Sequence, residues 1–315
     1  MALAGARDPR ASVGHGQRSE ALAGYGFVAI PMFLFLVLNV GAIFYAIYIS
    51  VWQWNIRSGP GAFIGLKDYQ SALADPIFHR AIQNTLYYAA VWVPLTMAVG
   101  LFLAVLVNQK LRGRTFFRAA FYFPAIASSA AITILWIFLA APDGFFNGVR
   151  AALGLNPIFQ LFGFGPNQDW IGDSKTALNS VILLNAWTTS GTFMLFYLAS
   201  LQTISHEVYE AAAIDGANSW QMFWRITFPL LKPGHYFVAT IAVIGALQLF
   251  DQAAIAGGSD GSPANALMTV VLFLYNQAIV KFDFDYAAAV GIILFVIIFT
   301  ITLIQRRLFG SAPAW

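Results

Sequence analysis

The sequence predicts an all-α integral membrane protein with six membrane-spanning helices. Of its 315 residues, 59% are hydrophobic and only 10% are charged, and the mean hydropathy is +0.69. A water-soluble domain carries roughly 25% charged residues, so most of this surface requires a solvent other than water. Six segments are apolar over about 20 residues, the length that crosses a hydrocarbon core about 30 Å thick.

The expected spans are separated by polar or charged segments. They are residues 24–50, 84–107, 118–140, 177–202, 234–255 and 285–305. A seventh charge-free window, 261–280, has an apolar core of only Ala266–Tyr275, so we expect a surface or partly inserted helix there. Residues 151–168 also lack charge but are interrupted by glycine and proline, which predicts a loop.

The positions of the basic residues predict the orientation. With the N-terminus in the cytoplasm, most of the 17 lysines and arginines fall in inner segments, namely Arg7, Arg10, Arg18, Lys110, Arg112, Arg114, Arg118, Arg225, Lys232, Arg306 and Arg307. This excess on one side agrees with the positive-inside rule. A seventh span at 261–280 would place Arg306 and Arg307 outside. The sequence therefore favours six spans with both termini cytoplasmic.

Four segments are expected along the chain. Residues 1–23 are interpreted as a disordered cytoplasmic tail and 24–80 as the first spanning helix with an outer loop. Residues 81–306 are interpreted as a transmembrane core with a cytoplasmic loop at 205–233, and 307–315 as a second tail. The chain has no cysteine and only four scattered histidines, so we expect no metal site.

The cytoplasmic loop begins with the pattern of a short helix. Ser205 is a good N-cap for a helix that carries acidic residues early and Ala211–Ala213 in its middle. Asp215-Gly216 should end this helix, because glycine readily takes a left-handed conformation.

A second short helix is expected after Gly216. Asn218 or Ser219 would cap the helix Trp220–Ile226, which should stop before Pro229. The pattern alone fits equally well an amphipathic helix pair lying on the membrane surface with its aromatic residues at headgroup depth.

The same loop resembles the EAA loop of binding-protein-dependent ABC importer permeases. That motif reads E-A-A, three residues, G, nine residues and I-x-L-P. The matching residues here are Glu210, Ala211, Ala212, Gly216, Ile226 and Pro229, with Phe228 in place of the usual leucine. The resemblance implies the type I ABC importer permease fold, and it covers about residues 20–310.

Further segments are similar to the carbohydrate-uptake branch of that family. They are Asp169–Asp173, Ala199–Glu207, Phe250-Asp251, Gly257-Gly258, Tyr275 and Tyr286–Ala288. The chain is most similar to the leading permease of maltose, trehalose and glycerol-phosphate systems. Relatives often have G-G-P after the fifth span, whereas Ser259–Ser262 separate Gly258 from Pro263 here.

The resemblance implies that the loop docks on an ATPase. The docking residues would be Glu210, Ala211, Ala212, Ile214, Asp215, Gly216, Trp220, Ile226 and Pro229. Such docking is helix-in-groove recognition, with Glu210 as the charge, Ile214 and Trp220 as the apolar anchor and Gly216 setting the angle between the arms.

The resemblance also implies the partners of the chain and its location in the cell. The chain would pair with a second homologous permease as a heterodimer, with two ATPase subunits and with an extracytoplasmic sugar-binding protein. It would lie among lipids in a bacterial or archaeal plasma membrane, would bind no nucleic acid or cofactor and would not itself be an enzyme. ATP and Mg²⁺ would be used by the ATPase.

Polar residues at membrane depth are candidates for a sugar path. Alignment on the docking loop with maltose-type permeases implies contacts near Thr188, Thr189, Thr192, Gly245 and Gln248. Thr188 and Thr192 are one turn apart and could face one cavity. Asp251 could line the path or contact the binding protein at the outer rim. Alternatively, these polar residues join helices by hydrogen bonds, as they often do in membranes.

Two other functions remain open. The same machinery could carry another solute, such as a polyamine, phosphate or a peptide. An ion-coupled secondary transporter would normally show acids within its spans and inverted repeats, and Asp251 is the single candidate for such an acid. A membrane enzyme is disfavoured, because no nucleophile motif, His/Glu cluster or phosphate-binding glycine loop is present.

Overall fold

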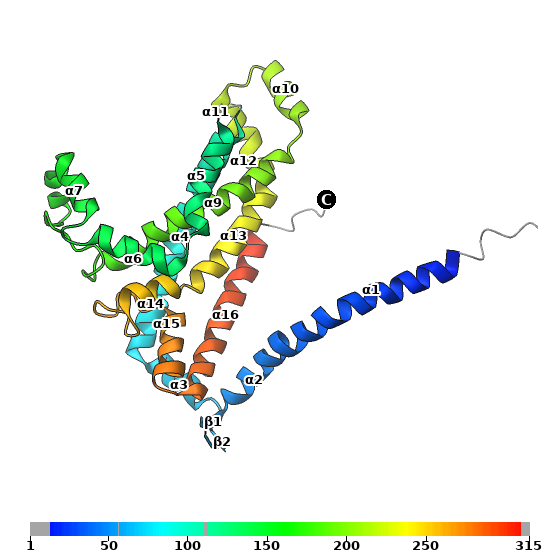
Figure 1. The fold of residues 1–315 in the computed structure, drawn as a ribbon, viewed down its shortest axis with the longest axis vertical. Coiled ribbons are helices and arrows are strands. Elements are labelled where there is room, and N and C mark those ends of the chain that lie inside the picture. The colour runs from blue at the N-terminus through cyan, green and yellow to red at the C-terminus, as the bar shows by residue number, and fades with distance from the viewer. Residues whose placement is uncertain (1–12, 56, 110–112, 310–315) are drawn as a thin grey trace, which may run out of the picture.

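The computed structural model describes residues 13–55, 57–109 and 113–309, and they form an almost entirely helical chain (Figure 1). The single sheet in these residues is a two-stranded antiparallel hairpin of β1 (Trp52–Asn55) and β2 (Gly59–Phe63). Trp54 pairs with Pro60 and Asn55 with Gly59. The hairpin follows the first helical arm and precedes α3 (Lys67–Ala74).

Five helical segments are long and apolar enough to cross a membrane. Within the described residues these are Ala23–Ile49, Pro76–Asn108, Ala177–Gln202, Lys232–Gly257 and Phe284–Leu308. A bent pair of helices provides a sixth span if its two arms are counted as one. The expected spans at 24–50, 84–107, 177–202, 234–255 and 285–305 each lie on one of the five.

The third expected span, 118–140, is not a straight helix. It consists of α5 (Arg114–Ile126) and α6 (Ser129–Ala140), whose axes differ by 95°. The break falls at Ala127-Ser128, where both backbones are extended. Gln252 donates a hydrogen bond of 3.0 Å to Ser129 Oγ and ties the start of α6 to another helix. The third expected span is therefore occupied by a bent pair of helices.

The N-terminal arm stands apart from the remaining helices (Figure 1). It consists of α1 (Val13–Phe35), a π-helical turn (Leu36–Val40) and α2 (Gly41–Ile49). Every residue from Ala23 to Asn39 is exposed in this chain. The helix begins at Val13, within the expected tail 1–23, because the sequence from Gln17 to Ala23 consists largely of good helix formers. Residues 1–12 lie outside the described part.

The core of the bundle is built on α4 (Pro76–Asn108) and α9 (Ala177–Gln202). Asp75 caps α4 by accepting hydrogen bonds from the amides of Ile77 and Phe78. Gly100 allows close packing of the two helices, because a Cβ there would lie 2.7 Å from Phe193 Cβ. On the other side of α9, a Cβ on Gly191 would lie 2.2 Å from the carbonyl oxygen of Phe121 on α5.

The last third of the chain completes the bundle. It contains α13 (Lys232–Leu247), α14 (Asp251–Gly257), α15 (Val270–Tyr275) with a π-helical turn (Asn276–Val280), and α16 (Phe284–Phe309). Residues 270–280 are too short to span, as expected. Asn84 of α4 donates to the carbonyls of Asn265 and Met268, so the non-helical backbone before α15 is satisfied internally. The helix α16 extends through Phe309, so the expected tail 307–315 begins within it; residues 310–315 lie outside the described part.

Residues 151–168 were expected to form a loop and are partly helical. They contain the end of α7 (Phe145–Ala152) and the whole of α8 (Asn156–Leu161). Gly154 and Gly163, each with a positive φ, follow these two short helices. Glycine therefore ends the helices here rather than preventing them.

Candidate functional site

The first arm of the loop is α10 (His206–Ile214). The hydroxyl oxygen of Ser205 accepts a hydrogen bond of 3.3 Å from the amide of Glu207, which is the expected cap. Glu210 lies 3.0 Å from His206 one turn earlier, and both side chains are largely exposed. Of the three alanines, Ala212 faces inward and is buried.

The arm ends at Gly216, whose φ of +77° is in the left-handed region. The amides of Gly216 and Ala217 donate to the carbonyls of Ala213 and Ala212 and close the turn. A Cβ on Gly216 would meet no atom within 4 Å, so the constraint on this residue is conformational rather than steric.

The second arm is one continuous helical segment from Ser219 to Leu230. It comprises α11 (Ser219–Met222), a π-helical turn (Phe223–Thr227) and α12 (Phe228–Leu230). Asn218 and Gln221 form a reciprocal capping box. The expected end before Pro229 was wrong, because the π-helical turn pairs the Phe228 amide with the Phe223 carbonyl just before Pro229, which has no N–H.

Two large apolar side chains of the loop are not buried by other residues of this chain. Ile214 at the end of α10 is 87% exposed and Trp220 at the start of the second arm is 71% exposed. Glu210, Asp215 and Pro229 are also exposed, whereas Ile226 is half-buried. The two arms are joined by Tyr209 and Thr227, whose hydroxyl oxygens lie 3.2 Å apart.

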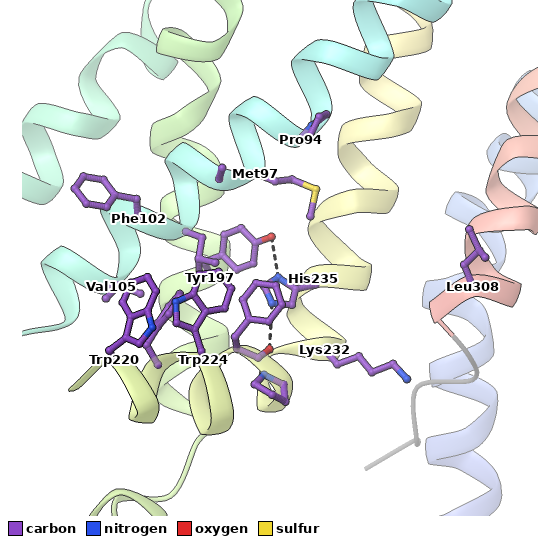
Figure 2. Close-up of a pocket in the computed structure, with 15 residues that line it drawn as sticks. Pro94, Met97, Phe102, Val105, Tyr197, Trp220, Trp224, Lys232, His235 and Leu308 are labelled. Atoms are coloured by element: carbon purple, nitrogen blue, oxygen red, sulfur yellow. Dashed lines mark hydrogen bonds between the residues drawn. The ribbon is translucent and has the colours of Figure 1, made fainter. Parts of the chain in front are cut away.

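The base of the loop is fixed to the spans through His235 of α13. The two ring nitrogens of His235 lie 3.1 Å from the Tyr197 hydroxyl of α9 and 3.2 Å from the Phe228 carbonyl oxygen of α12 (Figure 2). The rings of His235 and Phe228 pack with centroids 4.6 Å apart. These contacts fix the second arm against α9 and α13.

An apolar pocket of about 1020 Å³ lies above the second arm. Figure 2 shows Trp220 and Trp224 on one side of it and Pro94 and Met97 of α4 on another. Its lining is almost entirely apolar, so it offers a sugar few hydrogen bonds.

A second, more polar pocket of about 350 Å³ lies between α4, α9 and the end of α13. Its lining includes four of the sequence-predicted path residues, Thr189, Gly245, Gln248 and Asp251. Thr188 and Thr192 are not among its lining residues, and the Thr188 hydroxyl donates to the carbonyl of Asn185 within its own helix.

Sequence reasoning missed two aromatic residues of this pocket, Tyr88 and Trp92 of α4. Their rings stack with centroids 5.7 Å apart and an interplanar angle of 14°. Asn185 donates a hydrogen bond of 2.8 Å to the Tyr88 hydroxyl and thereby fixes its position. The spacing of four residues, which places two aromatic rings on one face of the span, is the signal that could have identified this pair.

The family model described as "Binding-protein-dependent transport system inner membrane component" matches residues 96–311. The arabinooligosaccharides transport system permease protein AraP of Bacillus subtilis is 35% identical over 294 residues, covering 93% of this chain and 90% of that protein. The lactose transport system permease protein LacF of Rhizobium radiobacter is 33% identical over 285 residues, covering 90% and 92%.

A solved structure gives the same fold. A chain of a bacterial alginate ABC transporter, in complex with an alginate pentasaccharide-bound periplasmic protein, superposes with a TM-score of 0.78 at 20% identity. The match covers 94% of this chain and 98% of that one. The family model, the relatives and the two-armed loop agree, and the chain belongs to the inner membrane components of binding-protein-dependent transport systems, the permease subunits of ABC importers.

Proposed function

We propose that this permease forms half of the translocation pore of an ATP-driven importer for a sugar or a sugar derivative. The observation that carries the proposal is a continuous mechanical link between the loop and the polar pocket. One end of α13 holds His235 against the second arm of the loop, and its other end carries Gly245 and Gln248 into the pocket. A helix of these 16 residues is a rod of about 24 Å.

The chemistry of the polar pocket suits a saccharide. The amide of Gln248 and the hydroxyl of Thr189 offer hydrogen bonds, and the buried aromatic rings of Tyr88 and Trp92 form part of the apolar wall. Carbohydrates present hydroxyl edges and C–H faces, which these groups complement. The relatives named for arabinooligosaccharides and for lactose support the assignment to sugars.

The exposed apolar residues of the loop fit a groove on an ATPase subunit. Ile214 and Trp220 are spaced across the Gly216 turn, and an amphipathic helix commonly binds by placing such anchors in a hydrophobic groove. ATP hydrolysis resides on that separate subunit, which uses the ATP and Mg²⁺, and this chain binds no cofactor of its own. Closure of two ATPase subunits would move the loop and α13 together.

The exposed N-terminal arm fits a second permease. Residues 23–39 form an uninterrupted apolar surface that packs against nothing in this chain, as expected for a helix that completes a heterodimer. The complex would receive its sugar from an extracytoplasmic binding protein, with both termini of this chain in the cytoplasm of a bacterium or archaeon. Lipid of the plasma membrane surrounds it, and nucleic acid has no part in the cycle.

Uptake by the reconstituted complex tests the proposal. The two permeases, the ATPase and the binding protein are placed in liposomes with ATP on the ATPase side, and a panel of labelled mono- and oligosaccharides is compared with a polyamine, phosphate and a peptide. We expect accumulation of a saccharide that requires both ATP and the binding protein. Transport without ATP contradicts an ATP-driven importer, and accumulation of only a non-sugar solute contradicts the substrate class.

A further inference from the structure

The segment at residues 144–168, here named the side lobe, contains α7 and α8 and lies at the far end of α6, away from the bundle (Figure 1). It was expected to belong to a loop between two spans. Its only ionisable residue is Arg150, which is 4% exposed. A water-exposed connection of this length normally carries several charges, so this composition requires an explanation.

Arg150 points into the side lobe. Its Nε donates to Asn156 Oδ1 at 2.9 Å, and its Nη2 donates to the carbonyl oxygens of Gly165, at 2.6 Å, and of Pro166. Its guanidinium lies over the rings of Phe159 and Trp170, 5.2 and 5.7 Å from their centroids. The charge is thus removed from the surface and used to satisfy carbonyl groups of a non-helical segment.

Asn147 satisfies three further carbonyl groups at the two ends of the side lobe. Its Nδ2 donates to the carbonyl oxygens of Ala141, Pro142 and Gln168 at 2.8–3.2 Å. Its Oδ1 accepts a hydrogen bond of 3.0 Å from Trp170 Nε1. In water these carbonyls could bond to solvent. In a bilayer, backbone groups outside helices must find partners within the protein, and Arg150 and Asn147 supply them for five carbonyls here.

The outward side of the side lobe is apolar. Phe145 and Val149 of α7 and Leu153 at its C-cap recur every fourth residue and are exposed. On α8, Leu161 and its neighbour Phe162 are 87% and 73% exposed. Monomeric soluble proteins rarely expose contiguous apolar patches of more than a few hundred Å², so this face is covered by something other than water.

Continuity with α6 identifies the cover. On α6, which belongs to a segment apolar enough to span a membrane, Ile134, Leu135 and Phe138 are exposed. The side lobe extends this apolar surface, and the exposed Asp143 is the one charged residue between α6 and the lobe. Protein interfaces usually carry a polar rim, whereas residues 144–168 expose no charged side chain. We propose that the side lobe is seated in the lipid bilayer, with the apolar faces of α7 and α8 against acyl chains.

The absence of native cysteine allows a direct test. Single-cysteine variants Leu161→Cys and Phe162→Cys are labelled with a nitroxide, and Ser58→Cys in the exposed β1–β2 turn is the water-facing control. The complete transporter is reconstituted in liposomes, and collisions with oxygen and with a water-soluble nickel chelate are compared by power saturation. We expect oxygen to relax the labels at 161 and 162 several-fold more than nickel does, and the reverse at 58.

Three results overturn the proposal. Nickel accessibility at 161 and 162 equal to that at 58 places the side lobe in water. Labels that are immobilised and screened from both reagents place it against another protein. Accessibility that changes when the loaded binding protein is added identifies that protein as the occupant.

Discussion

The hydroxyl of Tyr197 on α9 lies 3.1 Å from Nδ1 of His235 on α13, and the two rings pack edge to face with centroids 5.3 Å apart. The other ring nitrogen of His235 contacts the Phe228 carbonyl of the loop. One imidazole therefore joins two spans and the second arm. A displacement of the arm cannot occur without moving α9, α13 or this contact.

Replacing His235 by Ala should weaken this junction. The change leaves the Tyr197 hydroxyl and the Phe228 carbonyl without their partner, and an unpaired buried polar group costs about 1–3 kcal/mol. We expect a lower thermal unfolding midpoint and a loss of ATPase stimulation by the loaded binding protein. Tyr197→Phe, which removes only the hydroxyl, should have a smaller effect. Tyr25→Phe in the exposed N-terminal arm is the control.

Gly216→Pro and Glu210→Lys should uncouple transport while the protein still inserts. Proline requires a φ near −65°, which the observed +77° excludes. Glu210→Lys reverses the charge of an exposed side chain. Its contact with His206 is also exposed and contributes little to stability, so a loss of uptake in this variant would report on docking. ATP-dependent uptake is measured at equal amounts of membrane-inserted permease. Wild-type uptake in both variants would refute the docking assignment.

Gly216→Ala separates conformation from contact at the same position. An alanine side chain meets no atom, so the expected penalty is only the cost of a left-handed backbone, about 1–2 kcal/mol. We expect partial uptake, between that of the wild type and that of Gly216→Pro. Uptake as low as in the proline variant would mean that the partner fills the space beside Gly216.

Gln248→Ala and Thr189→Ala should raise the KM for uptake, because both side chains line the polar pocket. Thr188→Ala and Thr192→Ala are matched controls on the same turns of α9 that lie outside this lining. We expect at least a several-fold difference between the two pairs, since one lost hydrogen bond to a neutral group corresponds to about 1 kcal/mol. Equal effects in both pairs would favour a role in joining helices.

Gly191→Val should destabilise the packing of α5 on α9. A Cβ there would overlap the Phe121 carbonyl, and the neighbour is backbone, which cannot rotate away. Overpacking typically costs about 1–3 kcal/mol. The unfolding midpoint of the purified complex should fall, whereas Gly148→Val on α7, where a Cβ meets no atom, should leave it unchanged.

The carboxyl pair at the start of α16 should make the adjacent hairpin sensitive to pH. Partial burial and a hydrogen bond with Asp285 raise the pKa of Asp283 from 3.8 to about 6, and Asp285 also accepts from the Trp54 amide of β1. The raised pKa means that the stabilising contribution is complete below pH 4 and is lost as the pH rises through 6.

We therefore expect more hydrogen-exchange protection in β1 and the start of α16 at pH 5 than at pH 7.5, after correction for intrinsic rates. Asp283→Asn should remove this difference, because it keeps the hydrogen bond without a titrating proton. An unchanged pH dependence in the variant would exclude the pair as its source.

The fold was largely predictable because the length of an apolar segment and the position of a glycine determine spans and helix ends through neighbouring residues alone. Five of the six expected spans each lie on one long apolar helical segment, although α13 and α14 share the fifth. Gly216 and Asn218 hold the positions in the loop that their residue types favour. Such features depend on a few neighbouring residues and on the thickness of a bilayer. They need no knowledge of the tertiary structure.

What sequence reasoning missed depends on tertiary contacts. The 95° bend after Ile126 is held by Gln252, which is distant in sequence. Around Arg150, the guanidinium binds carbonyls 15 and 16 residues later and thereby joins parts of the lobe that are distant in sequence. The place of Tyr88 and Trp92 in the pocket follows from the packing of α4 on α9, and periodicity alone cannot distinguish such a face from a lipid-facing one.

The exposed N-terminal arm has a consequence for biogenesis. Residues 23–39 of this arm pack against nothing else in the described part of the polypeptide. With a second permease as the proposed cover, burial of the arm is a second-order reaction whose rate depends on the concentration of that chain. A cell that made this subunit in excess would accumulate molecules with an orphan helix, a form that membrane proteases can recognise. The exposed surface of α1 thus makes balanced synthesis of the assembling chains necessary.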